Sequence, residues 1–416
     1  MRREIGHRAA LRRLGVATTT GAIVALALFG GSAASAPGRA SATEVRVVTL
    51  PIANGFPLDL GIKKGFFAQQ GIEVKKTTLQ SGNDVVLALA NNNGDIGYLG
   101  FVPMYIAVTS GIPLTLVAAS EVEGISARDN WQNILVKGSS SIRTPGDLRG
   151  KTIAVNALKG VGEVMIKAAM EKKGIKPDAF RLTALPFPQM RSALNNGQVD
   201  AIWVPEPFLS QGLNLDGDRI VMAPGPVLAR YWPIGGYAAR SAWKSGNPAL
   251  AQKFRTAINK SLTYAQAHPA EIREMLPPGT QNVRLPIWSP LVDRTKLQQL
   301  AGYAKKYGVI TKLPNMKQLV PNSIASGLVL QGTVTNRRLL LALGAKAVTK
   351  LNVGPYTFVV TDSSKTQNFR LKGPGVNRST PLKGRGRATW TLNLRRGTYR
   401  YWSDGKPRVK KSFKVG

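Results

Sequence analysis

Residues 44–74 read EVRVVTLPIANGFPLDLGIKKGFFAQQGIEV, and their pattern decides the fold class. A largely apolar, valine-rich strand is predicted at Glu44–Leu50, and a helical pattern over Leu58–Gln70 is closed by Gly71. Strand character resumes at Ile72–Thr78. A strand, a helix and a second strand joined by short connections are typical of a βαβ unit in a parallel sheet.

The same alternation continues along the chain. Helices are predicted at Asp84–Asn91, Met104–Thr109, Glu163–Lys173 and Met190–Asn195, and strands at Asp95–Leu99, Leu114–Ala119, Asn133–Val136, Thr152–Val155, Phe180–Ala184 and Asp200–Val204. We therefore predict two α/β lobes with mostly parallel sheets. The chain is expected to cross between them near Arg128–Asn133 and again near Pro224–Gly235. Residues 244–330 are expected to be helical, with proline breaks, and to pack back on the lobes.

Composition excludes several kinds of chemistry. The chain has 416 residues, of which 43% are hydrophobic, so two or three domains with real cores are expected. It contains no cysteine, which excludes disulfides, thiolate metal sites and cysteine nucleophiles. The two histidines, His7 and His268, are too few for a histidine-based metal site. We therefore expect neither a cofactor nor catalytic activity.

The first 42 residues resemble an export signal. Five arginines precede an apolar run at 22–29, and the small residues Ala34-Ser35-Ala36 or Ala40-Ser41-Ala42 would place cleavage near Pro37 or Thr43. The apolar run is shorter than the ~20 residues of a membrane span. Without cysteine there is no site for lipidation. We predict export to the periplasm or the cell surface, without a lipid anchor.

Charge divides the mature chain unevenly. Residues 333–416 hold 19 lysines and arginines against two acids, Asp362 and Asp404, a net charge of +17. Such a shift in composition predicts a domain boundary, giving a binding domain at 43–332 and a tail at 333–416. The basic tail favours an anionic cell-wall or membrane surface as a partner, and export argues against nucleic acid. Basic residues that alternate with apolar ones are also typical of solvated strand faces.

Four motifs in order carry a resemblance to a known family. They are GIKKGFFAQQGIEV (61–74), NGDIG (93–97), DLRGKTIAV (147–155) and ALNNGQVDAIWVPEP (193–207). Over roughly 43–330 the chain resembles the solute-binding proteins of ABC importers for nitrate, alkanesulfonates, taurine and thiamine precursors. The resemblance implies a two-lobe, type 2 periplasmic-binding fold that closes on its ligand like a hinge. It also implies an ABC permease with its ATPase as partners.

Loops at the carboxyl ends of the predicted strands are the candidate binding site. Ligands of open α/β sheets lie beyond these strand ends, where helix N-termini favour anions. The candidate ligand-binding residues are Asn54, Gly55, Phe56, Ser81, Gly82, Asn83, Phe101, Val102, Trp131, Gly160, Val161, Gly162 and Glu206. Trp131, Trp203 and Trp232 are either stacking partners of a ligand or packing between the lobes. Glu206 stands where the family often has an acidic residue beside the cleft; an interlobe hydrogen bond or a transporter contact is the alternative.

The tail resembles a second family. Short strands are predicted at Leu339–Ala342, Ala347–Leu351, Tyr356–Val360, Gln367–Leu371, Thr389–Leu394 and Tyr399–Trp402, giving a small β-sandwich. Together with the motifs at 373–376, 396–401 and 412–415, they resemble a cupredoxin-type domain. The positions that match its copper ligands are Gln367, Ser403, Lys406 and Val409, none of which suits copper. We predict a copper-free module for adhesion or spacing.

Several functions compete. The leading one is an extracytoplasmic solute-binding protein for a small anionic or zwitterionic organic solute, with a sulfonate held by helix N-termini and an ammonium held by Glu206. A neutral thiamine-precursor pyrimidine, stacked on Phe56 or a tryptophan, is the alternative ligand. A cell-surface receptor or adhesin that does not transport is the alternative role. Fungal thiamine-pyrimidine synthases share the fold, but they depend on histidine and clustered cysteines, which argues against an enzyme here.

Overall fold

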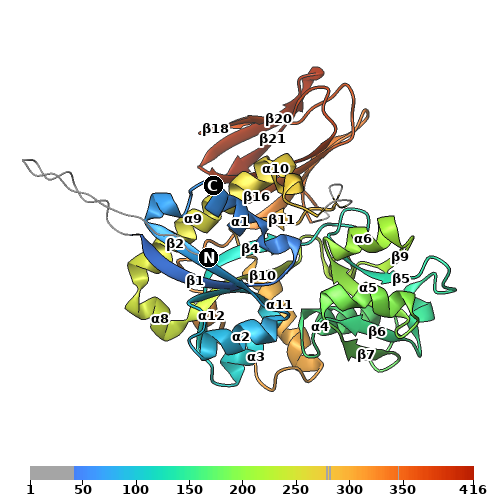
Figure 1. The fold of residues 1–416 in the computed structure, drawn as a ribbon. Coiled ribbons are helices and arrows are strands. Elements are labelled where there is room, and N and C mark those ends of the chain that lie inside the picture. The colour runs from blue at the N-terminus through green and yellow to red at the C-terminus, as the bar shows by residue number, and fades with distance from the viewer. Residues whose placement is uncertain (1–41, 278–279, 281–282, 345) are drawn as a thin grey trace, which may run out of the picture. The chain divides into compact units, whose positions relative to one another are not determined.

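The structure, a computed structural model, describes residues 42–416 except 278–279, 281–282 and 345 (Figure 1). The predicted export signal at 1–42 therefore lies almost wholly outside the described residues. No helix within the described ranges is both long enough and apolar enough to cross a membrane.

The first lobe is built on a six-stranded sheet with the order β11-β4-β10-β3-β1-β2 (Figure 1). Its strands are β1 (Thr43–Thr49), β2 (Ile72–Thr78), β3 (Ile96–Gly100), β4 (Leu114–Val122), β10 (Pro233–Arg240) and β11 (Ile287–Trp288). β1 runs parallel to β2 and β3, whereas β10 runs antiparallel to β3 and β4. Every residue of β3 and β4 is buried, as expected of strands covered on both faces.

The second lobe repeats this design. Its strands are β5 (Gln132–Val136), β6 (Thr152–Val155), β7 (Arg181–Ala184), β8 (Ala201–Pro205) and β9 (Arg219–Met222), in the order β7-β6-β8-β5-β9. β5 is antiparallel to both neighbours, and it is the first strand after the chain leaves β4. In the same way, β10 is the first strand after the return. The predicted crossovers near Arg128–Asn133 and Pro224–Gly235 are therefore confirmed.

Helices connect the strands of both lobes. The first lobe has α1 (Phe56–Lys63), α2 (Gly82–Ala90), α3 (Phe101–Thr109), α8 (Ser241–Gly246), α9 (Pro248–Ala267), α10 (Pro269–Glu274), α11 (Arg294–Lys306) and α12 (Met316–Leu319). The second lobe has α4 (Val161–Lys172), α5 (Phe187–Asn195) and α6 (Phe208–Leu215), and α7 (Pro224–Leu228) lies in the return crossover. α9 packs on α1 and β4 through buried residues such as Phe254, Ile258 and Leu262.

Two segments differ from the sequence prediction. The helix expected over 58–70 ends at Lys63, because Gly65 takes a left-handed conformation (φ 70°), and a short 3-10 turn follows at Ala68–Gln70. The region 244–330 is not wholly helical. β11 pairs with Val122 and Glu121 at the edge of the first sheet. A two-residue strand carries too short a pattern to be seen in sequence.

The tail is all β, as predicted, but it begins earlier than expected. Its two five-stranded sheets have the orders β14-β13-β12-β16-β19 and β15-β21-β20-β17-β18. The strands are β12 (Leu328–Val334), β13 (Leu339–Leu343), β14 (Lys346–Ala347), β15 (Lys350–Leu351), β16 (Gly354–Asp362), β17 (Arg370–Gly373), β18 (Val376–Ser379), β19 (Gly386–Leu394), β20 (Gly397–Ser403) and β21 (Lys406–Val415). β12 pairs with β13 and β16, so the predicted boundary at 332/333 is wrong and the tail starts near Leu328. Charge composition could not locate this boundary, because β12 carries no charged residue.

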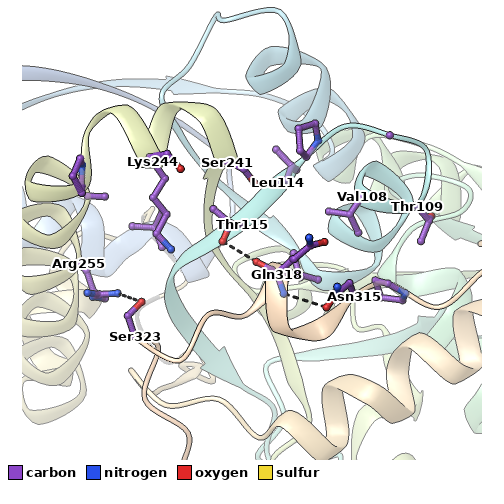
Figure 2. A pocket seen from close by; sticks show the side chains of 18 of the residues that line it. Val108, Thr109, Leu114, Thr115, Ser241, Lys244, Arg255, Asn315, Gln318 and Ser323 are labelled. Atoms are coloured by element: carbon purple, nitrogen blue, oxygen red, sulfur yellow. Dashed lines mark hydrogen bonds between the residues drawn. The ribbon is translucent and has the colours of Figure 1, made fainter.

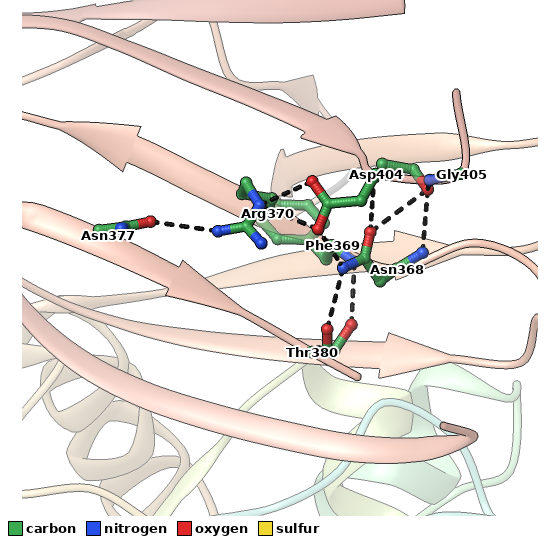
Figure 3. Close-up of polar contacts among 8 residues, drawn as sticks. Asn368, Phe369, Arg370, Asn377, Thr380, Asp404 and Gly405 are labelled. Atoms are coloured by element: carbon green, nitrogen blue, oxygen red, sulfur yellow. Dashed lines mark hydrogen bonds and ion pairs between the residues drawn. The ribbon is translucent and has the colours of Figure 1, made fainter. Parts of the chain in front are cut away.

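One of the positions that match copper ligands, Ser403, belongs to a polar network around Asn368 and Asp404 (Figure 3). Asn368 donates from Nδ2 to Asp404 Oδ2 at 2.8 Å, and Arg370 donates from Nε to Asp404 Oδ1 at 2.7 Å. The hydroxyl of Ser403 accepts from the Asn368 backbone at 3.0 Å. Gln367 and Ser403 are buried, Lys406 is exposed, and the side chain of Val409 is outside the described part. The copper-free character and the cupredoxin resemblance remain predictions.

Candidate functional site

A small cavity lies between the two lobes at the carboxyl ends of their strands. Its volume is about 50 Å³. The first lobe lines it with Leu50, Ile52, Asn54, Gly82, Asn83, Tyr98, Gly100, Pro103 and Ile234, and the second lobe and the crossover line it with Trp131, Gln132, Asn156, Ala157, Gly160, Val161, Phe187, Trp203 and Pro205. Among the described residues, no charged side chain lines the cavity. Its polar groups are side-chain amides, the tyrosine hydroxyl, the tryptophan indoles and the backbone.

Three helices begin at this cavity. Gly82 and Asn83 form the first turn of α2, Gly100 precedes α3, and Gly160 precedes α4. No side chain caps α3 or α4, because both N-cap residues are glycines. Free N–H groups at a helix N-terminus favour an anion by roughly 0.3–1 kcal/mol, and by up to ~2 kcal/mol when partly buried. The arrangement therefore provides positive potential without a cation.

A buried hydrogen-bond chain supports the first-lobe wall. Asn54 donates from Nδ2 to the Tyr98 hydroxyl at 2.8 Å, and Tyr98 donates to Glu121 Oε1 at 2.6 Å. Burial raises the pKa of Glu121 to about 7, although the hydrogen bond from Tyr98 favours its ionised form. These two hydrogen bonds fix the Asn54 side chain at the cavity wall.

A second buried carboxyl group supports the crossover. Gln132 donates from Nε2 to Glu123 Oε1 at 2.6 Å, and Asn130 donates to the same oxygen at 3.2 Å. Burial raises the pKa of Glu123 to about 8. Trp131 Nε1 donates to the Val122 carbonyl at 3.1 Å, which ties the crossover to β4. Trp131 and Gln132 are thus held where they face the cavity.

Two buried polar atoms on cavity-lining residues have no hydrogen-bond partner in the described structure. They are the acceptor Asn54 Oδ1 and the donor Trp203 Nε1. Buried polar atoms are almost always paired, so these two atoms are available to pair with a ligand or a water molecule. The Trp203 ring packs beside Phe187 and over Gly162, where a methyl group would lie only 2.6 Å from Cε3.

Six of the predicted residues line the cavity. They are Asn54, Gly82, Asn83, Trp131, Gly160 and Val161. Of the others, Ser81 caps α2 by accepting from the Asp84 backbone, Phe101 and Val102 point into the core, and Gly55, Phe56 and Gly162 do not line the cavity. Trp203 lines the cavity, whereas Trp232 packs against Tyr303.

The placement of Glu206 corrects the sequence prediction. Its side chain is fully buried and does not line the cavity. Oε2 accepts from the Ser210 backbone N–H at 2.9 Å, and Oε1 accepts from the Ser210 hydroxyl at 2.8 Å and from the Arg284 backbone N–H at 2.9 Å. Glu206 therefore stabilises the chain around α6, which excludes the predicted contact with a ligand ammonium in this conformation.

Several lining residues were missed from the sequence. Asn156 and Ala157 follow β6 directly, so the strand-end rule that found Asn54 also applied to them. Tyr98 lies inside β3, and Gln132 and Phe187 are the first residues of β5 and α5; no local motif marks any of them as different from core residues.

The lobes touch each other around the cavity. A methyl group on Gly100 would overlap the side chain of Val161, which lies at the start of α4 in the other lobe. Farther along α4, Glu171 accepts hydrogen bonds from Lys306 Nζ and the Tyr307 hydroxyl, both at 2.6–2.8 Å, at the end of α11. Through these contacts the two lobes are closed against each other.

With this geometry established, the comparisons with known proteins identify the family. Residues 53–272, more than half of the chain, match the family described as "NMT1/THI5 like". The chain belongs to the NMT1/THI5-like family. It is 25% identical over 242 residues to the nitrate/nitrite binding protein NrtA of Nostoc sp., covering 55% of this chain and 54% of that protein. It is 30% identical over 152 residues to the taurine-binding periplasmic protein of Escherichia coli, covering 36% and 45%.

Solved structures agree with this NMT1/THI5-like assignment at the level of the fold. The alkanesulfonate-binding protein SsuA of Xanthomonas axonopodis pv. citri, bound to MOPS, has a TM-score of 0.58 at 19% identity, covering 67% of this chain and 98% of that chain. The nitrate-binding protein NrtA of Synechocystis PCC 6803 has a TM-score of 0.58 at 15% identity, covering 68% and 87%. The predicted two-lobe fold is confirmed. The chain spans about half the length of the curated relatives that it matches.

Proposed function

We propose that this protein is an extracytoplasmic solute-binding protein. It binds a small organic anion of the sulfonate class in the cavity between its lobes and delivers it to an ABC permease with its ATPase. Support comes from family membership, from relatives named for binding nitrate, taurine and aliphatic sulfonates, and from a cavity at two matching sets of strand ends. The role is binding and release, without catalysis.

The ligand class is inferred from two features of the cavity. Three helices begin at it, and no charged side chain lines it among the described residues. An anion in such a cavity is held by backbone N–H groups and by amide and indole donors such as Asn83, Asn156 and Trp203. A carboxylate on the wall would repel it, and none is present among the described lining residues. A cavity of about 50 Å³ also favours a compact head group over a drug-sized ligand, which needs roughly 300 Å³ or more.

The correction at Glu206 changes the expected preference between ligands. A taurine-like zwitterion brings an ammonium group, which needs an acceptor on the cavity wall. Asn54 Oδ1 is the unpaired acceptor available there, and it is neutral. We therefore expect a simple alkanesulfonate such as methanesulfonate to bind at least as tightly as taurine.

The test is a calorimetric titration of the mature protein with methanesulfonate, comparing wild type with Asn156→Asp. Asn156 lines the cavity, and the substitution adds one negative charge at nearly constant volume. Anion affinity should fall at least tenfold, about 1.4 kcal/mol. Asn196→Asp makes the same change on the exposed surface of the same lobe and should leave affinity unchanged. Equal binding by all three proteins would refute the anion site.

A neutral pyrimidine is the second candidate ligand. Tyr98, Trp131, Phe187 and Trp203 all line the cavity, and aromatic walls favour a flat ring. Phe56, which was expected to stack on the ring, does not line the cavity. The same variants separate the two ligands, since Asn156→Asp should leave the affinity for a neutral pyrimidine nearly unchanged.

The tail supports a second candidate role, attachment to an anionic polymer of the cell envelope. One face of its second sheet carries a groove of about 550 Å³ lined by Arg370, Lys372, Gly373, Asn377, Thr398, Arg400, Trp402 and Lys410. Lys410 Nζ lies 5.2 Å from the centre of the Trp402 ring. Four cations line the groove, and Arg370 among them is paired with Asp404. The other three, with no acidic lining residue among those described, favour a polyanion. Export and the absence of a lipid anchor are part of this proposal.

A further inference from the structure

A large pocket lies in the first lobe, away from the interlobe cavity (Figure 2). Its volume is about 860 Å³. Its walls are the loop between α3 and β4, the helices α8 and α9, and the segment 312–323. It surrounds Leu114, where β4 begins, whereas the interlobe cavity lies towards the other end of the sheet. A nine-residue strand separates its ends by roughly 25 Å, so the two sites do not overlap.

Three cations line this pocket without a carboxylate among the described lining residues. They are Lys244, Arg255 and Lys312. Arg255 Nη1 donates to the Ser323 hydroxyl at 2.9 Å (Figure 2). Lys244 Nζ donates to the Leu116 carbonyl at 3.2 Å, so the partners of both cations are neutral. Within the described residues, neither side chain forms an ion pair.

The positive charge in this pocket is partly desolvated. Lys244 and Arg255 are both half-buried, and burial lowers the pKa of each. The nearby Arg255 lowers the pKa of Lys244 further. Removing a cation from water costs free energy unless an anion compensates for it. Two adjacent, half-buried cations beside an open volume therefore leave room for an anion to supply that compensation.

The remaining wall is partly apolar. Its apolar side chains include Val108, Leu114, Val117, Leu313 and Leu319, and between them lie residues with hydroxyl or amide groups, such as Ser241 and Gln252. Leu313 is 56% exposed, so its side chain is accessible from the pocket. The volume also falls in the range of ligand pockets, roughly 300–1,000 Å³, which combine apolar walls with a few polar groups.

We propose that this pocket is a second ligand site, which binds an organic anion with an apolar body. Its carboxylate, sulfonate or phosphate group pairs with Lys244 and Arg255, and its carbon chain lies against Leu114, Leu313 and Leu319. This site is independent of the transported solute, because it lies entirely within one lobe and at the other end of the sheet.

Two measurements with defined probes test the proposal. Crystals of the mature protein soaked in sodium selenate should show an anomalous peak within hydrogen-bonding distance of Lys244 Nζ and the Arg255 guanidinium. Calorimetry with octanesulfonate should show binding that weakens at least tenfold in Lys244→Met. Lys253→Met removes an exposed cation from α9 outside the pocket and is the matched control. Asn156→Asp, which acts in the interlobe cavity, should leave this binding unchanged.

A further variant separates binding from a purely structural role of the cations. Gln252 lines the pocket one helical turn before Arg255, so Gln252→Glu places a carboxylate beside the guanidinium. It should abolish octanesulfonate binding and raise the melting temperature, because it compensates the charge internally. Octanesulfonate binding that survives both Lys244→Met and Gln252→Glu, or selenate density found elsewhere only, would overturn the proposal.

Discussion

The Glu206 carboxylate accepts a hydrogen bond from the backbone N–H of Arg284 at 2.9 Å, joining two residues that lie 78 positions apart. Glu206 follows β8 in the second lobe, and Arg284 lies in the segment that leads to β11 of the first lobe. The Glu206 backbone adds two more links, since its carbonyl accepts from Ala53 and its N–H donates to the Trp131 carbonyl. The acidic residue of the VPEP motif is therefore a connection between the lobes.

Replacing Glu206 by glutamine should lower stability and leave ligand affinity alone. The amide group of glutamine would face at least one backbone N–H that now donates to a carboxylate oxygen, which costs about 1–3 kcal/mol. Urea unfolding should show this loss, while calorimetry with methanesulfonate and taurine should give wild-type affinities. If Glu206→Gln selectively lost affinity for taurine, Glu206 would contact the ligand ammonium, and its placement in the structure would be contradicted.

Stability should fall as pH rises from about 4.5 to 8. Burial raises the pKa of Glu121 to about 7 and that of Glu123 to about 8, so the folded state keeps protons that the unfolded chain releases near pH 4.5. The unfolded state then binds fewer protons over this range, and the free energy of unfolding decreases with pH. A shift of this size in Glu121 alone corresponds to about 3 kcal/mol.

Urea unfolding at a series of pH values measures this effect. Glu121→Gln should flatten the decline up to about pH 7, and Glu123→Gln should flatten it up to about pH 8. A wild-type profile that rises between pH 5 and 8, or variants that keep the full decline, would show that these carboxyl groups are ionised in the folded protein.

Gly100→Ala should hold the lobes apart. The added methyl group would overlap the Val161 side chain across the cleft, so the closed form becomes less favourable. Small-angle X-ray scattering should show a larger radius of gyration than wild type, and methanesulfonate affinity should fall. Gly302→Ala, on α11 with open space around its Cα, is the control. Identical scattering and affinity in both variants would mean that this contact does not limit closure.

The basic groove of the tail should bind polyanions through Arg400 and Lys410. Reversing both charges to glutamate should lower the salt concentration at which the mature protein elutes from heparin, because screened contacts between charges hold it there. A double variant of the exposed Lys63 and Lys173 in the lobes makes the same change in net charge. If both variants elute together, only net charge matters, and the groove has no particular role.

Local patterns predicted the fold well, and six of the residues predicted for the site line the interlobe cavity. β6 spans Thr152–Val155 as expected, because a short apolar run between a Gly-Lys turn and a polar loop indicates a buried strand. Strand ends located Asn54 and Gly160 at the cavity. Glu206 was expected to face the ligand, but its position in the sequence does not determine which way its side chain points. In the structure the backbone N–H groups of Ser210 and Arg284 bind its carboxylate. The pocket around Lys244 was invisible, since it joins three segments that are far apart in sequence.

The most direct test of the central claim is a crystal structure of the mature protein grown with methanesulfonate. The interlobe site predicts density for one sulfonate in the cavity, with its oxygens near the N-terminus of α4 and within hydrogen-bonding distance of Trp203 Nε1. If calorimetry shows binding while the density lies outside this cavity, or if the cavity holds only water at saturating ligand, the account of the site is contradicted.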